Sequence, residues 1–412
     1  MGSDQMDLIP IARPLLGAEE TDAVGRALAS GWVSQGPEVA AFEREFAETV
    51  GAGYACALSS CTTALHLALL ALGVRPADEV VTVSHSFIAT ANAIRYCGAV
   101  PVFVDIDPGT FNLRPERLEA AIGPRTRAIL AVHQLGMPSD LPAILSIARR
   151  HGLPVVEDAA CAIGSEILID GQWEAIGRPH GDIACFSFHP RKVITTGDGG
   201  MLTTRNAEYD QRFRLWRQHG MSVPDTVRHG SREVIFESYP ELGFNYRMTD
   251  IQAAVGRVQL RRLPAIIAER RALAATYGTL LGAIPRLVLP AEPEWARSNW
   301  QSFAVRLPAG FAQRAVMQAL LDRGIATRRG VMCMHREAAY PPGTWRCGQR
   351  GMSRGCACPP YTCAALVESE LAQDRCLILP LYPGMTTAEQ QRVVVALREV
   401  LAGTGGGRYD GC

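Results

Sequence analysis

The reactive chemistry of this chain centres on Lys192, its only lysine. Of the 41 strongly basic side chains among the 412 residues, the other 40 are arginine. A bias toward arginine can replace surface lysines freely, because both are long cations on a solvated face. It cannot do so where an amine must react, since a guanidinium keeps its proton and an ε-amine can form an imine. Unless one lysine survived by chance, its retention indicates a reactive amine.

That amine must lose its proton before it can react. A free lysine has a pKa of about 10.4, so on the order of one amine in a thousand is neutral at pH 7. Lowering the pKa to about 7.4 takes roughly 4 kcal/mol of differential destabilisation of the cation, which desolvation and imine formation can supply. We therefore expect Lys192 in a shielded pocket. Gly197, Gly199 and Gly200 predict a tight turn that holds it there.

A carboxylate is predicted beside the same pocket. Asp158 follows the apolar strand expected over 153–157, and the strand expected over 183–188 leads into Lys192. Ligands of open α/β sheets bind at the carboxyl ends of the strands. Asp158 alone is also suited to capping a helix. Beside an imine-forming lysine, it matches the needs of pyridoxal phosphate (PLP), which takes an amine at its aldehyde and an acid at its ring nitrogen.

A candidate phosphate site completes this set. Residues 59–63, Ser-Ser-Cys-Thr-Thr, follow a strand and open a helix expected over 62–72. Free backbone N–H groups and hydroxyls at a helix N-terminus bind anions, although the same residues equally suit an ordinary N-cap. Ser187 adds a hydroxyl from the strand that leads to Lys192. The three features together are more specific than any one of them.

The elements that position these residues alternate along residues 15–205. This alternation predicts a three-layer α/β domain with a mainly parallel, buried sheet. The predicted strands are 54–58, 79–83, 101–104, 128–132, 153–157, 183–188 and 201–204, with helices such as 62–72, 88–97 and 141–150 between them.

A long helix expected over 251–273, kinked or divided by Pro264, leads into a smaller α+β region. We therefore expect two domains, a large one over residues 1–255 with an N-terminal arm and a small one over 256–412. The small domain is predicted to contain a strand over 301–307, helices over 311–323 and 387–401, and a disordered tail over 403–412.

Four of the 12 cysteines cluster, at Cys347, Cys356, Cys358 and Cys363. Their spacing lacks the paired C-x2-C knuckles of structural zinc sites. We therefore favour a Gly/Pro-rich insertion over 341–363 with free thiols, placed in the small domain near the substrate entrance; a metal site is the alternative, and no metal is predicted.

Composition limits the partners. The formal net charge is zero, so nothing favours nucleic acid or an anionic membrane surface. No run of about 18 apolar residues and no N-terminal signal pattern are present, and we expect a cytoplasmic protein.

Six segments carry a recognisable set of motifs. They are Ser-Gly-Trp-Val-Ser-Gln-Gly at 30–36, Thr-Thr-Ala-Leu-His at 62–66, Ser-Phe-Ile-Ala-Thr-Ala-Asn-Ala at 86–93, Glu-Asp-Ala-Ala at 157–160, Ser-Phe-His-Pro-Arg-Lys at 187–192 and Gly-Phe-Asn-Tyr-Arg-Met-Thr-Asp at 243–250. With them, the chain resembles the DegT/DnrJ/EryC1/StrS family of PLP-dependent sugar aminotransferases, of the aspartate-aminotransferase-like fold type I. The resemblance covers nearly the whole chain.

The resemblance implies a role for each matching position around the cofactor. Lys192 would hold PLP as an imine and later carry the proton between substrate and cofactor, and Asp158 would pair with the ring nitrogen. Thr62 and Ser187 would bind the phosphate. Cys61 replaces a glycine common in the family, which matters little if the contact is a backbone N–H.

Further positions are implied at the edges of the site. Phe87 would stack on the cofactor ring, although a core phenylalanine at the start of a helix is an equally natural interpretation. Asn245 would reach the phosphate of the other subunit, which makes a homodimer with shared active sites. Trp32 and His335 match substrate-side residues. Cys161 stands where many members have Gln or His, so this chain lacks the amide or imidazole that would form a side-chain hydrogen bond near the ring.

The expected reaction is transfer of an amino group from an amino acid, glutamate by preference, to a keto-sugar that is linked to a nucleotide. Family members that dehydrate deoxysugars replace the lysine by histidine, so Lys192 argues against dehydration. A keto-cyclitol acceptor is the nearest alternative. A PLP-binding regulator without turnover is a more distant one, which Lys192 and Asp158 together disfavour.

Overall fold

The computed structural model describes residues 8–224, 227–228, 231–348, 359 and 361–403. A large sheet forms the centre of the molecule. Most of its strands are apolar runs that end where the sequence turns polar. Its strands are β1 Tyr54–Leu58, β2 Glu79–Val83, β3 Val100–Val104, β4 Thr126–Val132, β5 Val155–Asp158, β8 Ile183–Ser187, β9 Gly200–Thr204 and β13 Arg346–Cys347.

The sheet is mainly parallel, as the sequence predicts. Among the described residues, its eight strands lie in the order β1-β9-β8-β5-β4-β2-β3-β13. Of these strands, only β9 runs antiparallel to its neighbours, β1 and β8. Every residue of β2 and β9 is buried, which fits a sheet covered by helices on both faces. The order places the ends of β5 and β8, and so Asp158 and Ser187, side by side.

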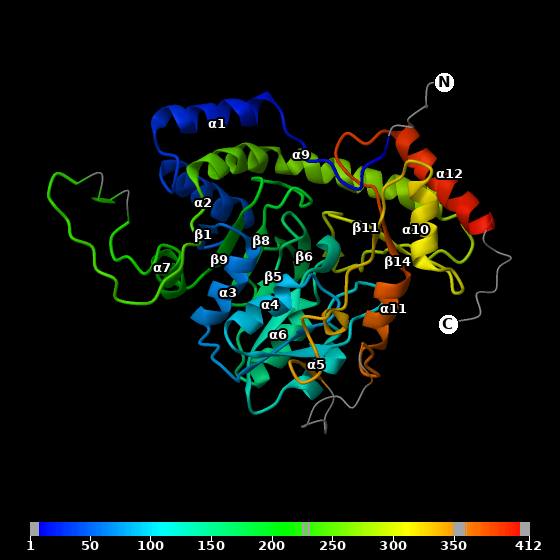
Figure 1. Cartoon of the computed structure of the whole chain (residues 1–412), viewed down its shortest axis with the longest axis horizontal. Helices are drawn as coiled ribbons and strands as arrows, with labels where there is room; N and C mark the ends of the chain where they lie inside the picture. Colours follow the sequence, from blue (N-terminus) through cyan, green and yellow to red (C-terminus); the bar gives the residue numbers. More distant parts are fainter. Residues whose placement is uncertain (1–7, 225–226, 229–230, 349–358, 360, 404–412) are drawn as a thin grey trace.

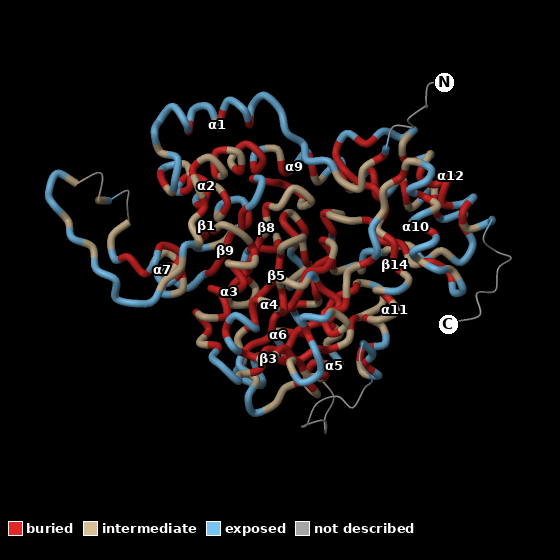
Figure 2. The backbone as a smooth tube through the Cα atoms, viewed as in Figure 1, coloured by how far each residue is buried: buried red, intermediate tan, exposed pale blue. Residues whose placement is uncertain are grey.

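Helices surround this sheet (Figure 1). Buried residues concentrate at its centre, and the exposed ones lie on the outer helices and loops (Figure 2). Helix α3 begins after Ser60, whose hydroxyl accepts the N–H of Thr63 at 3.2 Å. The helices of this region are α1 Ala18–Ser30, α2 Pro37–Val50, α3 Cys61–Ala71, α4 Ala89–Tyr96, α5 Pro115–Ala121, α6 Leu141–Arg150 and α7 Ala207–Trp216.

The long helix is α9, which runs without a break over Asp250–Leu281. Thr249 caps it by accepting the N–H of Gln252 at 3.2 Å. We expected Pro264 to kink or divide the helix, and the division is wrong. Proline removes one backbone donor, yet Leu263 and Ile266 on either side are buried in the main core, and this packing keeps the helix together.

A second hydrophobic core forms around the end of α9 and the C-terminal elements, at the right of Figure 1. The boundary that we proposed at residues 255 and 256 falls inside α9, whose first turns belong to the large core and whose last turns belong to the second. The division into two domains stays a prediction. The elements beyond α9 are β11 Phe303–Arg306, α10 Gln313–Leu321, β12 Arg328–Arg329, α11 Val367–Arg375, β14 Cys376–Leu379 and α12 Thr387–Gly403.

The cysteine-rich insertion does not lie where we expected it. Its strand β13 pairs in parallel with β3 and so extends the edge of the large sheet. Trp345 and Cys347 pack there in a small cluster with Phe103, which explains why the segment leaves the small domain. Cys363 is buried in the same cluster, whereas Cys356 and Cys358 lie outside the described residues, as does the tail beyond residue 403.

Two further observations concern partners. Among the described residues, no group of three or more His, Cys, Asp or Glu side chains is placed to hold a metal ion. No helix in the described ranges is long and apolar enough to cross a membrane.

A short sheet of β6 Glu166–Ile169, β7 Gln172–Ala175 and β10 Ala296–Arg297 completes the fold.

Candidate active site

A cavity of about 370 Å³ opens at the carboxyl ends of β5 and β8. This is the edge at which parallel sheets bind ligands. Residues from the large sheet, from the start of α3 and from β12 and β14 meet in its wall. Six of the residues predicted to bind the cofactor line it: Cys61, Thr62, Phe87, Asp158, Ser187 and Lys192.

Lys192 lies in the loop that joins β8 to β9. Its amine donates to the sulfur of Cys161 at 3.0 Å. Burial lowers the pKa of Lys192, but the Cys161 and Cys61 thiols and the Asp158 carboxylate outweigh it and raise that pKa above its ordinary value. The expected lowering combines desolvation with imine formation to the cofactor, and it stays a prediction. Groups that suit a cationic ring also attract the lysine ammonium, since opposite charge favours the charged form.

Asp158 is the last residue of β5, and its side chain is almost completely buried in the cavity floor. It accepts a hydrogen bond from the Thr90 hydroxyl at 2.9 Å and one from the Ala160 N–H at 3.2 Å. Burial raises the pKa of Asp158, against the lowering effect of these two donors and of Lys192. The described residues place no cation within ion-pair distance of this carboxylate. A cationic ligand atom is therefore the partner that the site lacks.

The start of α3 forms a wall of the cavity through Ser60, Cys61 and Thr62. The Ser60 hydroxyl already accepts the Thr63 N–H, but the N–H groups of Cys61 and Thr62 precede the first intrahelical hydrogen bonds. They suit an anion at the positive end of the helix. A Cβ at Gly200 would collide with the backbone of Ser60 and Cys61, so glycine is required for β9 to pass this turn.

Phe87 presents an apolar ring to the cavity, and 59% of the residue is exposed. The alternative that Phe87 is an ordinary core residue is therefore wrong. A large apolar side chain at the wall of a polar cavity is suited to a flat ring lying against it.

Arginines also line the cavity. Arg191, Arg328 and Arg329 line it together with His189. Arg329 is paired with Glu337 at 3.1 Å, whereas the described residues place no carboxylate within ion-pair distance of Arg191 or Arg328. The cavity can thus bind an anion in addition to the one at the start of α3.

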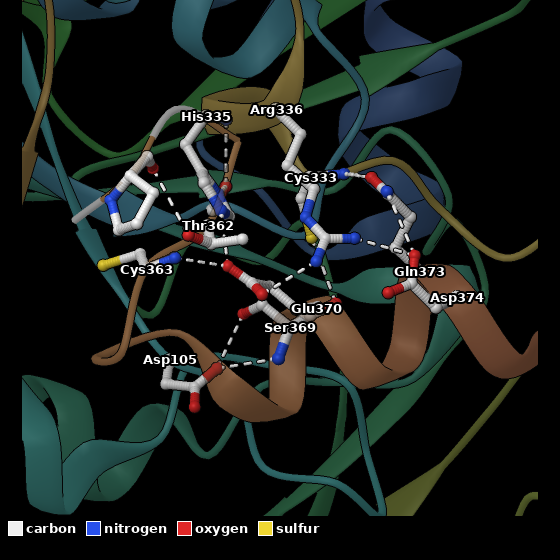
Figure 3. A network of polar contacts seen from close by, with 12 residues as sticks. Asp105, Cys333, His335, Arg336, Thr362, Cys363, Ser369, Glu370, Gln373 and Asp374 are labelled. Atoms are coloured by element: carbon white, nitrogen blue, oxygen red, sulfur yellow. Dashed lines mark hydrogen bonds and ion pairs between the residues drawn. The ribbon is translucent and has the colours of Figure 1, made fainter. Parts of the chain in front are cut away.

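His335 lies outside this cavity, in the polar network of Figure 3. Its Nδ1 lies 2.7 Å from the Ser84 hydroxyl and its Nε2 lies 3.0 Å from the Glu370 carboxylate of α11. Glu370 also accepts from Arg336 at 2.7 Å. Burial lowers the pKa of His335, against the raising effect of Glu370. Both ring nitrogens are engaged, so His335 supports the wall behind the site and does not face a ligand.

Trp32 and Asn245 also lie apart from the cavity of their own chain. The Trp32 ring packs beside Gly36, at the start of α2. Asn245 is exposed and forms an isolated β-bridge with Gln218. The roles that the resemblance implies for these two residues stay predictions.

Sequence reasoning missed Thr90 and the arginine pair at 328–329. Thr90 lies in one of the quoted motifs, but only the structure shows its hydroxyl on Asp158. Two adjacent arginines were a weak signal, because 40 arginines are spread over the chain.

Comparison with known proteins identifies this arrangement. The model of the DegT/DnrJ/EryC1/StrS aminotransferase family matches residues 14–398. The chain belongs to this family. This chain is 38% identical to the spore coat polysaccharide biosynthesis protein SpsC of Bacillus subtilis over 399 residues. These residues cover 96% of this chain and 97% of SpsC.

Solved structures agree with this assignment. The aminotransferase TlmJ from Streptoalloteichus hindustanus is 36% identical, with a TM-score of 0.82 over 96% of this chain and 99% of TlmJ. Helicobacter pylori PseC, an aminotransferase involved in the biosynthesis of pseudoaminic acid, shares the fold with a TM-score of 0.84 at 24% identity over 96% of this chain and all of PseC. The aminotransferase therefore has the PLP-transferase fold and depends on PLP.

The cavity fits this cofactor in three respects. The buried Asp158 carboxylate has no cationic partner among the described residues, and the exposed Phe87 ring lies open to the cavity. The N-terminus of α3 offers N–H groups to a phosphate. Lys192 stands in the same wall with a primary amine.

Proposed function

We propose that this aminotransferase moves an amino group from glutamate to a keto-sugar linked to a nucleotide. The observation that carries the proposal is the meeting, in one cavity, of the Lys192 amine, the Asp158 carboxylate and the arginines at 191 and 328. The first two serve the transfer of an amino group, and the arginines supply charge for anionic substrates.

The residues of this chain divide the work between them. When bound, PLP supplies an electron sink for the carbon that loses a proton. The Lys192 amine would hold the cofactor and would move the proton at the substrate carbon. Asp158, oriented by Thr90, would hold a proton at the ring nitrogen. Phe87 would support the ring, and Thr62, Ser187 and the N–H of Cys61 would hold the phosphate.

Charge in the cavity supports the choice of substrates. Glutamate carries a second carboxylate and a nucleotide-linked sugar carries a diphosphate, and both are anions that arginine binds well. A keto-cyclitol is neutral and gives Arg191 and Arg328 no partner. The cavity charge thus favours the nucleotide-linked acceptor over the cyclitol.

The substrates can be tested in two half-reactions. Protein loaded with PLP is mixed with L-glutamate, L-glutamine or L-alanine, and the loss of the visible band of the cofactor is followed. Glutamate should act fastest. The converted protein is then mixed with keto-sugar nucleotides or keto-cyclitols, and return of the band with a nucleotide-linked sugar is expected. Return with the cyclitol alone would overturn the acceptor proposal.

We further propose a homodimer whose active sites are shared. Asn245 is exposed and lies outside the cavity of its own chain. The preceding loop extends away from the body of the molecule in Figure 1, at the left beyond α7, and three of its large apolar side chains are at least 84% exposed: Val234, Phe236 and Leu242. Large exposed apolar side chains on a projecting segment support the proposal of a surface that binds protein.

Hybrid dimers test the sharing of sites. The variants Lys192→Ala and Asn245→Ala are each expected to be inactive or strongly impaired. When the two are co-expressed with different affinity tags, each hybrid dimer should regain one intact site, because one subunit supplies Lys192 and the other supplies Asn245. Hybrid dimers without activity would show that Asn245 acts within its own chain.

A further inference from the structure

Cys161 lies in the cavity wall, three residues after Asp158, and is held there by the backbone. Its carbonyl accepts the side-chain amide of Asn299 at 2.8 Å, and the same amide donates to the carbonyl of Ile163 at 2.8 Å. Asn299 is completely buried. The loop that carries Cys161 is therefore fixed before any ligand enters, which is the condition for a residue that positions another.

The thiol of Cys161 differs from the other cysteines that the structure describes. Eight of the nine described cysteines are buried, and Cys161 is the one that is partly accessible. Its sulfur lies 3.0 Å from the Lys192 amine, within the range of a hydrogen bond to sulfur.

The contact with Cys161 affects the pKa of the Lys192 amine, together with the other ionisable groups around it. The ionisable groups that influence Lys192 come from three other segments and its own loop: Cys161, Cys61 on α3, Asp158 on β5 and His189. Burial lowers the pKa of Lys192, and Cys161 is foremost among the groups that raise it. The hydrogen bond from the amine to the Cys161 sulfur favours the protonated amine, so its loss should move the balance toward the neutral amine.

We propose that Cys161 is a positioning residue for Lys192, whose sulfur holds the free amine against the cavity floor in the part of the reaction when that amine is not bonded to the cofactor. The inference rests on the role proposed for Lys192. It assigns to Cys161 a task in both half-reactions, because the amine must be released and captured again in each cycle.

The test uses the variants Cys161→Ala and Cys161→Ser, with Cys97→Ala as a control that removes a buried thiol outside the cavity wall. Apoprotein is mixed with PLP over a range of pH, and the rate of appearance of the visible band is measured. Cys161→Ala should move the midpoint of this profile to lower pH. It should also lower kcat by about tenfold to a hundredfold, as misplacement of a reacting group does. Cys161→Ser should fall between, and Cys97→Ala should match the parent protein.

Two outcomes separate this inference from the proposal on which it rests. Each sample is reduced with borohydride, and the labelled residue is identified by peptide mass spectrometry. If Lys192 is labelled in all variants and the midpoint of Cys161→Ala equals that of the parent protein, the role of Cys161 is refuted and that of Lys192 stands. If Lys192 is not labelled in the parent protein, the proposed function fails first. Circular dichroism and thermal unfolding show whether each variant is folded.

Discussion

The Thr90 hydroxyl donates a 2.9 Å hydrogen bond to Oδ2 of Asp158, so helix α4 orients the carboxylate at the end of β5. The Ser86 hydroxyl lies 2.8 Å from that of Thr90 and extends the chain of hydrogen bonds. Both residues are at most 2% exposed, and the carboxylate keeps one orientation in the cavity. The acid that serves the cofactor is thus held by residues of a different element.

Removing that hydroxyl should weaken retention of the cofactor. We expect Thr90→Val to raise the dissociation constant of PLP about tenfold, because a hydrogen bond to a charged buried group is worth about 1.5–3 kcal/mol and 1.4 kcal/mol is a factor of ten. Thr90→Ser keeps the hydroxyl and should stay near the parent value. Fluorescence titration of the apoproteins gives the constants. Equal constants for the Val and Ser variants would contradict the role of the hydrogen bond.

Arg328 should contribute to substrate affinity and not to the chemical step. We expect Arg328→Ala to raise the KM of the anionic substrates about tenfold with kcat nearly unchanged, since the lost contact serves substrate and transition state alike. Arg286→Ala, which removes an exposed arginine outside the cavity wall, is the control. Steady-state kinetics at low and high salt measure both effects, and the difference should shrink as salt rises. A fall in kcat alone would contradict this role.

Glu43 forms a buried ion pair that should make stability depend on pH. Its carboxylate contacts Arg217 and accepts from Arg214 at 2.7 Å. Burial raises the pKa of Glu43, but the two arginines outweigh it and lower that pKa below 4.5. A carboxyl group whose pKa is lowered by folding stabilises the fold at pH values above its pKa in the unfolded state. This contribution is lost as the pH falls through its pKa in the folded state.

The variant Glu43→Gln tests this ion pair. At pH 7 it should lose about 3–5 kcal/mol, because Arg217 is left buried without its partner. As the pH falls below 4.5, the parent protein loses the same interaction and the difference should narrow. Glu48→Gln, at an exposed position of the same helix, is the control. Urea unfolding at a series of pH values measures the difference, and a constant difference would refute the linkage.

Pro264 should cost stability even though it does not break α9. It is exposed and has no N–H, so the carbonyl of Leu260 lacks its helical donor. Pro264→Ala restores that donor and should raise the free energy of unfolding by up to about 3 kcal/mol. Ala265→Ser, at the adjacent exposed position, should change it little. A lower urea midpoint for Pro264→Ala would show that the fold depends on the missing hydrogen bond at Pro264.

The large sheet and the cofactor cavity could be predicted from the sequence because their signals are local. Apolar runs such as 79–83 read directly as buried strands, and the residues that follow β5 and β8 fall at the carboxyl edge by topology alone. The resemblance then placed Phe87 and Thr62 beside them. The place of each of these residues in the fold is determined by the residues next to it in the sequence.

Other features depend on contacts between distant segments and could not be predicted. Strand β13 joins β3 across more than 200 residues, and nothing in the insertion itself indicates this edge. His335 matched a substrate-side residue by position, yet Ser84 and Glu370 hold it in a buried network. The raised pKa of Lys192 likewise depends on Cys161 and Cys61, which approach it from other elements.

The most direct test of the account is the covalent attachment of PLP to Lys192. Because the chain has one lysine, borohydride reduction of the loaded protein can label one side-chain amine only. Peptide mass spectrometry should find the reduced adduct on the peptide that contains Lys192, and Lys192→Ala should show neither the adduct nor the visible band. A loaded parent protein without this adduct, or a Lys192→Ala variant that keeps it, would contradict the central claim.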